Sequence, residues 1–114
     1  MLQVRTEVRP SSIHGQGLFA LERICEGEVV WSFDPTIDRI SVAASGHFSW
    51  RTAHGYVTPG DDAKFINHSQ TPNLSTTPGL APVIAARDIE AGEELTESYT
   101  YDLDWPTYAA KLEP

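Results

Sequence analysis

The chain has 114 residues, of which 40% are apolar and 21% are charged, as is typical of one compact globular domain. Eight basic against sixteen acidic side chains give a formal net charge of −8, which argues against direct nucleic-acid binding because phosphate contacts need a cationic surface. The charge either favours a basic partner or serves solubility alone. A chain of this length buries enough surface to fold without disulfides or a structural metal.

The chain carries a single cysteine, Cys25, which excludes an intramolecular disulfide and any zinc site built on paired thiolates. One cysteine in the whole chain is typical of a reducing compartment. The amino-terminal residues contain no apolar leader, and the longest apolar stretch, residues 80–86, is interrupted by Pro82 and is too short to span a bilayer. We therefore expect a cytoplasmic protein that does not bind membranes.

Glycine and proline interrupt the chain at short intervals, eight of each, and this favours strands and turns over helices. No window shows a sustained helical period, and a short C-terminal helix or turn is expected only at residues 104–112. The fold class is therefore mainly β, with several short sheets. Alternation and β-branched or aromatic residues predict strands at residues 4–8, 18–20, 28–33, 83–86 and 94–101.

Two segments of the chain resemble each other. Residues 20–28 (ALERICEGE) and 85–93 (AARDIEAGE) share Ala, Ile, Gly and Glu at the same offsets. Each is interpreted as a strand followed by a turn, in which Gly27 and Gly92 suit a position with positive φ. The match is too short to prove a duplication, but it supports a domain built from similar hairpins.

Three groups of residues are candidates for chemistry, and each has a simpler structural interpretation. Residues 15–17 (Gly-Gln-Gly) are an ordinary tight turn or a place where backbone approaches a ligand closely. The polar segment 64–73 (KFINHSQTPN) is a well-capped loop or a ligand-binding loop. Tyr99 and Tyr101 alternate along an expected strand and so share one face, as core residues or as an aromatic wall that attracts cations.

Two common kinds of active site do not fit the chain. A serine hydrolase would need an activated nucleophile, but Ser69 adjoins His68 in sequence and no G-x-S-x-G elbow is present. The four histidines show neither the H-E-x-x-H spacing nor the paired thiolates of zinc sites. No metal is expected.

Taken in order, three segments resemble the SET domain of protein-lysine methyltransferases: residues 15–19 (GQGLF), residues 65–73 (FINHSQTPN), and residues 92–99 (GEELTESY). The resemblance spans residues 4–102 and is to a minimal form without pre-SET or post-SET zinc regions, so that residues 1–114 form one SET domain. It implies a β-clip fold in which the second and third segments cross as a pseudoknot. Two positions depart from the family, since Gln70 stands where many members carry Cys and Ser98 where Asp is frequent.

The resemblance implies an enzyme that transfers the methyl group of S-adenosylmethionine to a lysine amine. In this family the cofactor lies on one side of the crossing and lysine enters from the other. By position, Tyr99 would be the catalytic tyrosine beside the transferred methyl group, and Tyr101 would line the lysine channel. The implied cofactor-binding residues are Gly15, Gln16, Gly17, Asn67, His68, Tyr99 and Trp105.

The implied partner is a lysine-containing, basic protein. Residues 88–114 hold eight acids against one base around the expected lysine entrance. Residues 36–58 are short for the family's variable insert, so substrate recognition is minimal or is shared in a homodimer. In the tail, residues 103–114, Trp105 and Tyr108 either cover the cofactor or anchor a terminal helix.

Two alternatives share the site residues: a non-catalytic SET-fold module that binds basic peptides, and a methyltransferase of a small amine.

Overall fold

The computed structural model describes residues 1–43, 49–76 and 80–102, and it confirms the mainly β class with several short sheets. The helical elements of these residues are two single 3₁₀ turns, η2 (Asp62–Phe65) and η3 (Tyr99–Tyr101). The expected C-terminal helix or turn lies outside the described residues. The strands, in chain order, are β1 (Thr6–Pro10), β2 (Gln16–Ala20), β3 (Val29–Trp31), β4 (Arg39–Ser41), β5 (Trp50–Thr52), β6 (Gly55–Thr58), β7 (Asn67–His68), β8 (Leu74–Ser75), β9 (Val83–Ala85) and β10 (Thr96–Glu97).

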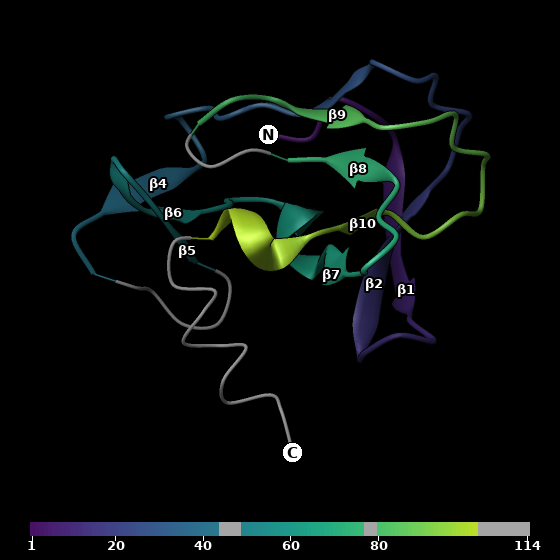
Figure 1. Cartoon of the computed structure of the whole chain (residues 1–114), viewed down its shortest axis with the longest axis horizontal. Coiled ribbons are helices and arrows are strands. Elements are labelled where there is room, and N and C mark those ends of the chain that lie inside the picture. The colour runs from purple at the N-terminus through teal and green to yellow at the C-terminus, as the bar shows by residue number, and fades with distance from the viewer. Residues whose placement is uncertain (44–48, 77–79, 103–114) are drawn as a thin grey trace.

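The strands form four small sheets, two of two strands and two of three. The hairpin β1-β2 lies at one end of the molecule in Figure 1, and the sheet ordered β4-β6-β5 lies at the other. The sheet ordered β3-β9-β8 joins strands from both halves of the chain, and the pair β10-β7 lies between the two ends. Because each sheet is small, loops rather than strands carry much of the chain.

The pair of β7 and β10 is parallel, whereas the other strand pairs of the described residues are antiparallel. Asn67 lies opposite Thr96 and His68 opposite Glu97. The Ser69 N–H extends the pairing by donating to the Glu97 carbonyl at 2.9 Å. The second and third segments of the sequence therefore lie side by side, as the expected crossing requires.

The two segments that resemble each other in sequence, 20–28 and 85–93, pair with each other. Ile24 and Ile89 exchange both backbone hydrogen bonds, each 2.8 Å long. The other bonds come in matched pairs, so that each contact of one copy has its counterpart in the other. They run from Gly27 N to Ala85 O (2.8 Å), Gly92 N to Ala20 O (2.7 Å), Ala85 N to Glu28 O (2.9 Å) and Ala20 N to Glu93 O (2.9 Å). The sequence similarity thus corresponds to a pseudo-twofold arrangement.

The turns of the two copies are built in the same way. Gly27 has φ +87° and Gly92 has φ +90°, which confirms the predicted positive φ at both glycines. The glutamate after each glycine then closes its own turn through its carboxylate. Glu28 accepts from the Cys25 N–H at 3.1 Å, and Glu93 accepts from the Glu90 N–H at 2.9 Å.

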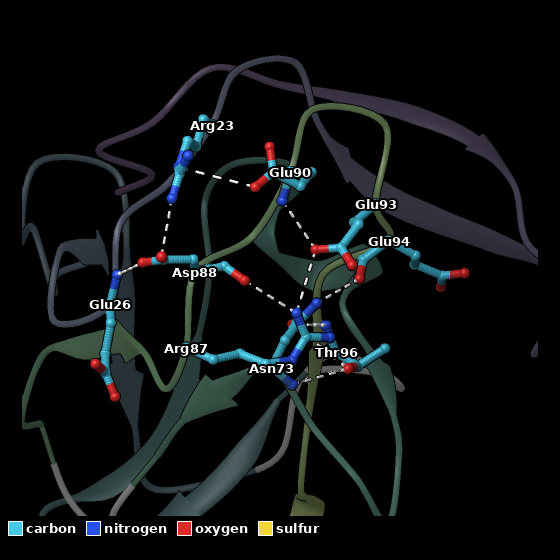
Figure 2. A network of polar contacts seen from close by, with 9 residues as sticks. All are labelled: Arg23, Glu26, Asn73, Arg87, Asp88, Glu90, Glu93, Glu94 and Thr96. Carbon is cyan, nitrogen blue, oxygen red and sulfur yellow. Dashed lines mark hydrogen bonds and ion pairs between the residues drawn. The ribbon is translucent and has the colours of Figure 1, made fainter.

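Exposed ion pairs cross this pairing, as Figure 2 shows. Arg23 of the first copy binds Asp88 of the second at 2.9 Å. Asp88 also accepts from the Glu26 N–H at 2.9 Å, and within the second copy Arg87 lies 3.3 Å from the Glu93 carboxylate. Ion pairs between side chains this exposed contribute little stability, because water and salt screen their charges. The backbone pairing and the buried side chains hold the two segments together.

The hydrophobic core gathers residues from both copies and from the strands that flank them. Ile24 and Ile89 are fully buried, and burying one such side chain stabilises the fold by roughly 1.5–3 kcal/mol. The remaining buried members of the core are Leu18, Ala20, Val30, Ile66, Leu74, Ala85 and Leu95. Ile66 and Leu95 directly precede β7 and β10, so the core anchors both strands of the parallel pair.

The predicted strands near β1, β2, β3 and β9 are present, and each differs from the prediction by one or two residues at one end or both. The predicted strand at residues 94–101 is wrong in its second half. The one named strand among residues 94–101 is β10, and Tyr99 and Tyr101 lie in the 3₁₀ turn η3. The Ser98 side chain caps this turn by accepting from the Thr100 N–H, and Asp102 N donates to Tyr99 O at 3.0 Å. The two tyrosines therefore do not alternate along a strand.

Candidate functional site

The first part of the candidate site is the loop between β1 and β2. The Ser11 N–H donates to Gly15 O at 2.8 Å and closes the loop. The Ser11 hydroxyl oxygen accepts from Ile13 N at 2.9 Å and from His14 N at 3.3 Å. Gly15 has φ +45°, a conformation that side chains disfavour, and an added Cβ there would meet no protein atom within 4 Å. The loop is exposed and leaves open space beside Gly15.

At Gly17 the space for a side chain is already occupied. It is buried, and a Cβ added there would lie 2.4 Å from a carboxylate oxygen of Glu94 and 2.8 Å from its Cδ. The sequence alone allowed a side chain at Gly15 or Gly17 to be excluded by a closely bound ligand. At Gly17, however, the close neighbour is part of the protein itself.

Asn67 connects this loop to β7. It is buried, and its Nδ2 lies 3.1 Å from His14 O and 3.1 Å from Gln16 O. The same nitrogen lies 3.2 Å from Ser11 Oγ and 2.9 Å from Glu94 Oε2. Four oxygen atoms around the nitrogen fix the orientation of the amide, because its oxygen could not take that place. Asn67 therefore holds the loop against the parallel pair.

His68 and Tyr99 form the second part of the site. The Tyr99 N–H donates to His68 Nδ1 at 3.0 Å, so the neutral imidazole carries its proton on Nε2. The two rings lie 5.2 Å apart between centroids. At its other end, the Tyr99 hydroxyl donates to Ile66 O at 2.6 Å. One short stretch, residues 66–68, thus holds both the backbone and the hydroxyl of this tyrosine.

The environment keeps the Tyr99 hydroxyl protonated. Burial raises the pKa of Tyr99 well above its usual value near 10, and the negative charge of Glu97 raises it further. A buried phenol is uncharged at physiological pH. The protonated hydroxyl donates to Ile66 O, and a phenol oxygen is also able to accept hydrogen bonds.

A second asparagine, Asn73, binds the backbone of β10 and of the residues just before it. From the sequence it had no expected role beyond a turn. Asn73 is buried, and its Nδ2 donates to Glu94 O at 2.8 Å, as Figure 2 shows. Its Oδ1 accepts from Thr96 N at 2.8 Å. At the far side of η3, the buried Asp102 accepts from Arg51 N at 3.1 Å and so connects the turn of Tyr99 to β5.

The structure brings most of the predicted site residues together. Gly15, Gln16, Gly17, Asn67, His68 and Tyr99 lie in one connected set of contacts. For Tyr101 only the backbone is described, and Trp105 lies outside the described residues. Sequence reasoning missed Ser11 and Glu94, which bind each other at 2.8 Å. Nothing in the sequence distinguishes Glu94 from the other acids near it, and only its partners in the structure do so.

The described residues contain no group of three or more His, Cys, Asp or Glu side chains placed to hold a metal ion. Among the described helical segments, none has both the length and the apolar character needed to cross a bilayer.

The family model described as "SET domain" matches residues 15–100, which is most of the chain and includes all three segments. The chain belongs to the SET-domain family. Among curated relatives, it is 32% identical over 90% of its length to the "Histone-lysine N-methyltransferase, H3 lysine-4 specific" of Schizosaccharomyces pombe. It is 30% identical over 83% of its length to the protein of the same name from Aspergillus oryzae.

The match covers only a small part of these relatives, 13% of the first and 9% of the second. Among solved structures, this SET domain is similar to KRYPTONITE in complex with mCHH DNA, H3(1-15) peptide and SAH, with a TM-score of 0.65 and 24% identity. That match covers 90% of this chain and 25% of KRYPTONITE. The likeness shows the fold, which agrees with the β-clip arrangement expected from the sequence.

Proposed function

We propose that this SET domain is a protein-lysine N-methyltransferase that uses S-adenosylmethionine. The observation that carries the proposal is that the three family segments meet at one site. Asn67 holds the loop of Gly15, and the next residue along β7, His68, holds Tyr99. The names of the relatives and the SAH in the KRYPTONITE complex support this reaction class and this cofactor.

The site residues fit the cofactor. The Asn67 amide is fixed with its nitrogen among protein oxygens, so its Oδ1 faces the other way as an acceptor that suits the ammonium of an amino-acid group. The open space beside Gly15 allows backbone to lie along a ligand. We expect Gln16, Gly17 and His68 to complete this contact surface, and Trp105 to cover it.

When bound, S-adenosylmethionine supplies a methyl group on a positively charged sulfur. The protein has to align the lysine amine with that methyl, and alignment alone is worth up to about 7–11 kcal/mol in the best cases. The Tyr99 hydroxyl, held by Ile66 O, can accept from the amine or from the methyl C–H through its lone pairs. The amine must be neutral, which for an ordinary lysine costs about 5 kcal/mol at pH 7.

We propose a lysine on a basic protein as the substrate. The net charge of −8 favours a cationic partner and argues against direct contact with nucleic acid. The two fungal relatives are named for lysine 4 of histone H3, so the H3(1-15) peptide is the first substrate to test. We expect Tyr101 to line the lysine channel.

The test is methyl transfer from labelled S-adenosylmethionine to the H3(1-15) peptide, with free lysine as a second acceptor. Transfer to the peptide supports the proposal. Transfer to free lysine alone would favour the small-amine alternative instead. Peptide binding in calorimetry with no heat from millimolar S-adenosylmethionine or its product would favour the non-catalytic binding module.

The basic character of the substrate has its own test. Attraction between exposed charges is screened beyond about 8 Å at physiological ionic strength. We therefore expect kcat/KM for the peptide to fall between low salt and half-molar salt. A flat profile would mean that the acidic residues serve solubility alone.

Location and assembly remain predictions. We expect a cytoplasmic protein, which fluorescence imaging of a tagged chain in its own cells would test. The short insert, residues 36–58, leaves substrate recognition either minimal or shared in a homodimer, and a homodimer predicts twice the chain mass of 12.6 kDa in light scattering.

A further inference from the structure

We propose that Glu94 is a positioning residue of the cofactor site. In this role its carboxylate holds the loop of residues 11–16 and the Asn67 amide in the geometry that binds S-adenosylmethionine. The inference rests on the proposed function and adds to it a residue that does not itself contact the substrate or the cofactor.

The carboxylate of Glu94 joins two donors that belong to different parts of the site. Ser11 Oγ lies 2.8 Å from its Oε1 and 2.9 Å from its Oε2. Asn67 Nδ2 lies 2.9 Å from Oε2. Hydrogen bonds to a charged acceptor are about twice as strong as those between neutral groups, so this carboxylate orients both donors firmly.

Through its contact with Ser11, Glu94 affects the conformation of the whole loop of residues 11–16. Because the Ser11 hydroxyl hydrogen is directed to Glu94, the oxygen of the same hydroxyl presents its lone pairs to Ile13 N and His14 N. The two hydrogens of the Asn67 NH₂ group are shared among the Glu94 carboxylate and the loop carbonyls of His14 and Gln16, so Glu94 also orients the amide that contacts these carbonyls. The backbone on both sides of Gly15 is thus set through one carboxylate.

Glu94 also lies where the three family segments meet. Its backbone forms an antiparallel bridge with Phe19, and its carbonyl accepts from Asn73 Nδ2 at 2.8 Å. The absence of a side chain at Gly17 leaves the space that its carboxylate fills. This arrangement gives a physical reason for the second glycine of the Gly-Gln-Gly run.

The decisive variant is Glu94→Gln, which keeps the shape of the side chain. Its amide offers one oxygen where the carboxylate offers two, so its NH₂ group must face either Ser11 or the Asn67 NH₂. We expect the Kd for S-adenosylhomocysteine and the KM for S-adenosylmethionine to rise about 10-fold. At saturating cofactor, kcat should stay within about twofold of wild type, because Tyr99 and its partners are unchanged.

The matched control is Glu93→Gln, the adjacent residue, whose carboxylate closes a turn at Glu90 N and Arg87. It should lower the melting temperature while leaving the Kd for the cofactor product unchanged. The double variant Ser11→Ala/Glu94→Gln tests the route of the effect. If Glu94 acts through Ser11, the double variant should weaken binding by less than the product of the two single effects.

The possible outcomes separate this inference from the proposed function. If wild-type protein neither binds S-adenosylhomocysteine nor transfers a methyl group, the proposed function fails and the positioning role fails with it. If wild type binds and the folded Glu94→Gln variant binds equally well, the positioning role alone is overturned. A fall in kcat with unchanged Kd would also overturn it, because that result would place Glu94 in the transfer step.

Discussion

Segments 20–28 and 85–93 have the same turn, the same glycine conformation and the same closing glutamate, yet they lead to different surroundings. After the first turn the chain enters β3 with Val29, whose side chain is exposed and whose backbone pairs with Ile84. After the second turn the corresponding position is Glu94, which pairs with Phe19 and binds Ser11 and Asn67. The residues that follow the repeated unit therefore set its surroundings and make the second copy part of the candidate site, while the unit itself stays the same.

If the two copies are structural equivalents, truncating their central isoleucines should have equal effects. Ile24→Ala and Ile89→Ala each remove a fully buried side chain. Each should lower the free energy of unfolding by about 2–5 kcal/mol, measured by urea denaturation. If one variant loses several kcal/mol less free energy of unfolding than the other, the two copies do not contribute equally to the core.

The chain after the second turn should carry the chemistry. Tyr99→Phe keeps the ring but loses the hydroxyl that donates to Ile66 O. We expect kcat to fall by about 10²-fold, the scale of losing one positioned polar group at a reacting centre. The Kd for S-adenosylhomocysteine should change little. Turnover of the variant close to that of wild type on the same peptide would remove Tyr99 from the transfer step.

Alanine substitutions at the two turn glycines should have the same effect on stability but different effects on cofactor binding. Neither Gly27 nor Gly92 has a protein atom within 4 Å of an added Cβ, so alanine is penalised only through positive φ. Both Gly27→Ala and Gly92→Ala should cost about 1–2 kcal/mol in urea denaturation. Because Gly92 lies two residues before Glu94, Gly92→Ala should in addition weaken cofactor binding. Equal cofactor affinity in the two variants would contradict this distinction.

The smallest effect should come from the ion pairs that join the copies. The Glu26 N–H, and then Arg23, hold the pKa of the Asp88 carboxyl below its usual value. A lowered pKa stabilises the fold above the usual carboxyl pKa, and this contribution is lost as the pH falls through the lowered value. The melting temperature of wild type should therefore exceed that of Asp88→Asn at pH 7. The difference should shrink below about pH 4, and a constant difference down to pH 2.5 would exclude this linkage.

The sequence predicted the features that depend on local chemistry. Gly27 and Gly92 were predicted to have positive φ, and both have it. The pairing of their two segments with each other was not predicted. The order of the three family segments predicted which parts of the chain would meet. The residues 15–17, Asn67, His68 and Tyr99 could be selected because each belongs to a recognisable run of residue types.

Other features have no local signal. The strand Arg39–Ser41 has no buried residue, so hydrophobic alternation could not reveal it or the sheet that it edges. The strands β7 and β10 are two residues long, too short for any period to be detected. Glu94 is one acid among many, and its role depends on Ser11, which lies 83 positions earlier in the chain. Long-range hydrogen bonds of this kind are set by topology and not by sequence pattern.

The reciprocal pairing of residues 20–28 with 85–93 also governs when the domain can fold. During synthesis the first copy leaves the ribosome long before its partner, so the backbone groups of Ala20 and Ile24 lack the acceptors and donors that complete them. Contacts of such high sequence separation slow folding and leave strand edges exposed in the meantime. Nascent chains that stop before residue 85 should therefore be substrates for chaperones and prone to aggregate, whereas release of the second copy completes the core and the site in one cooperative step.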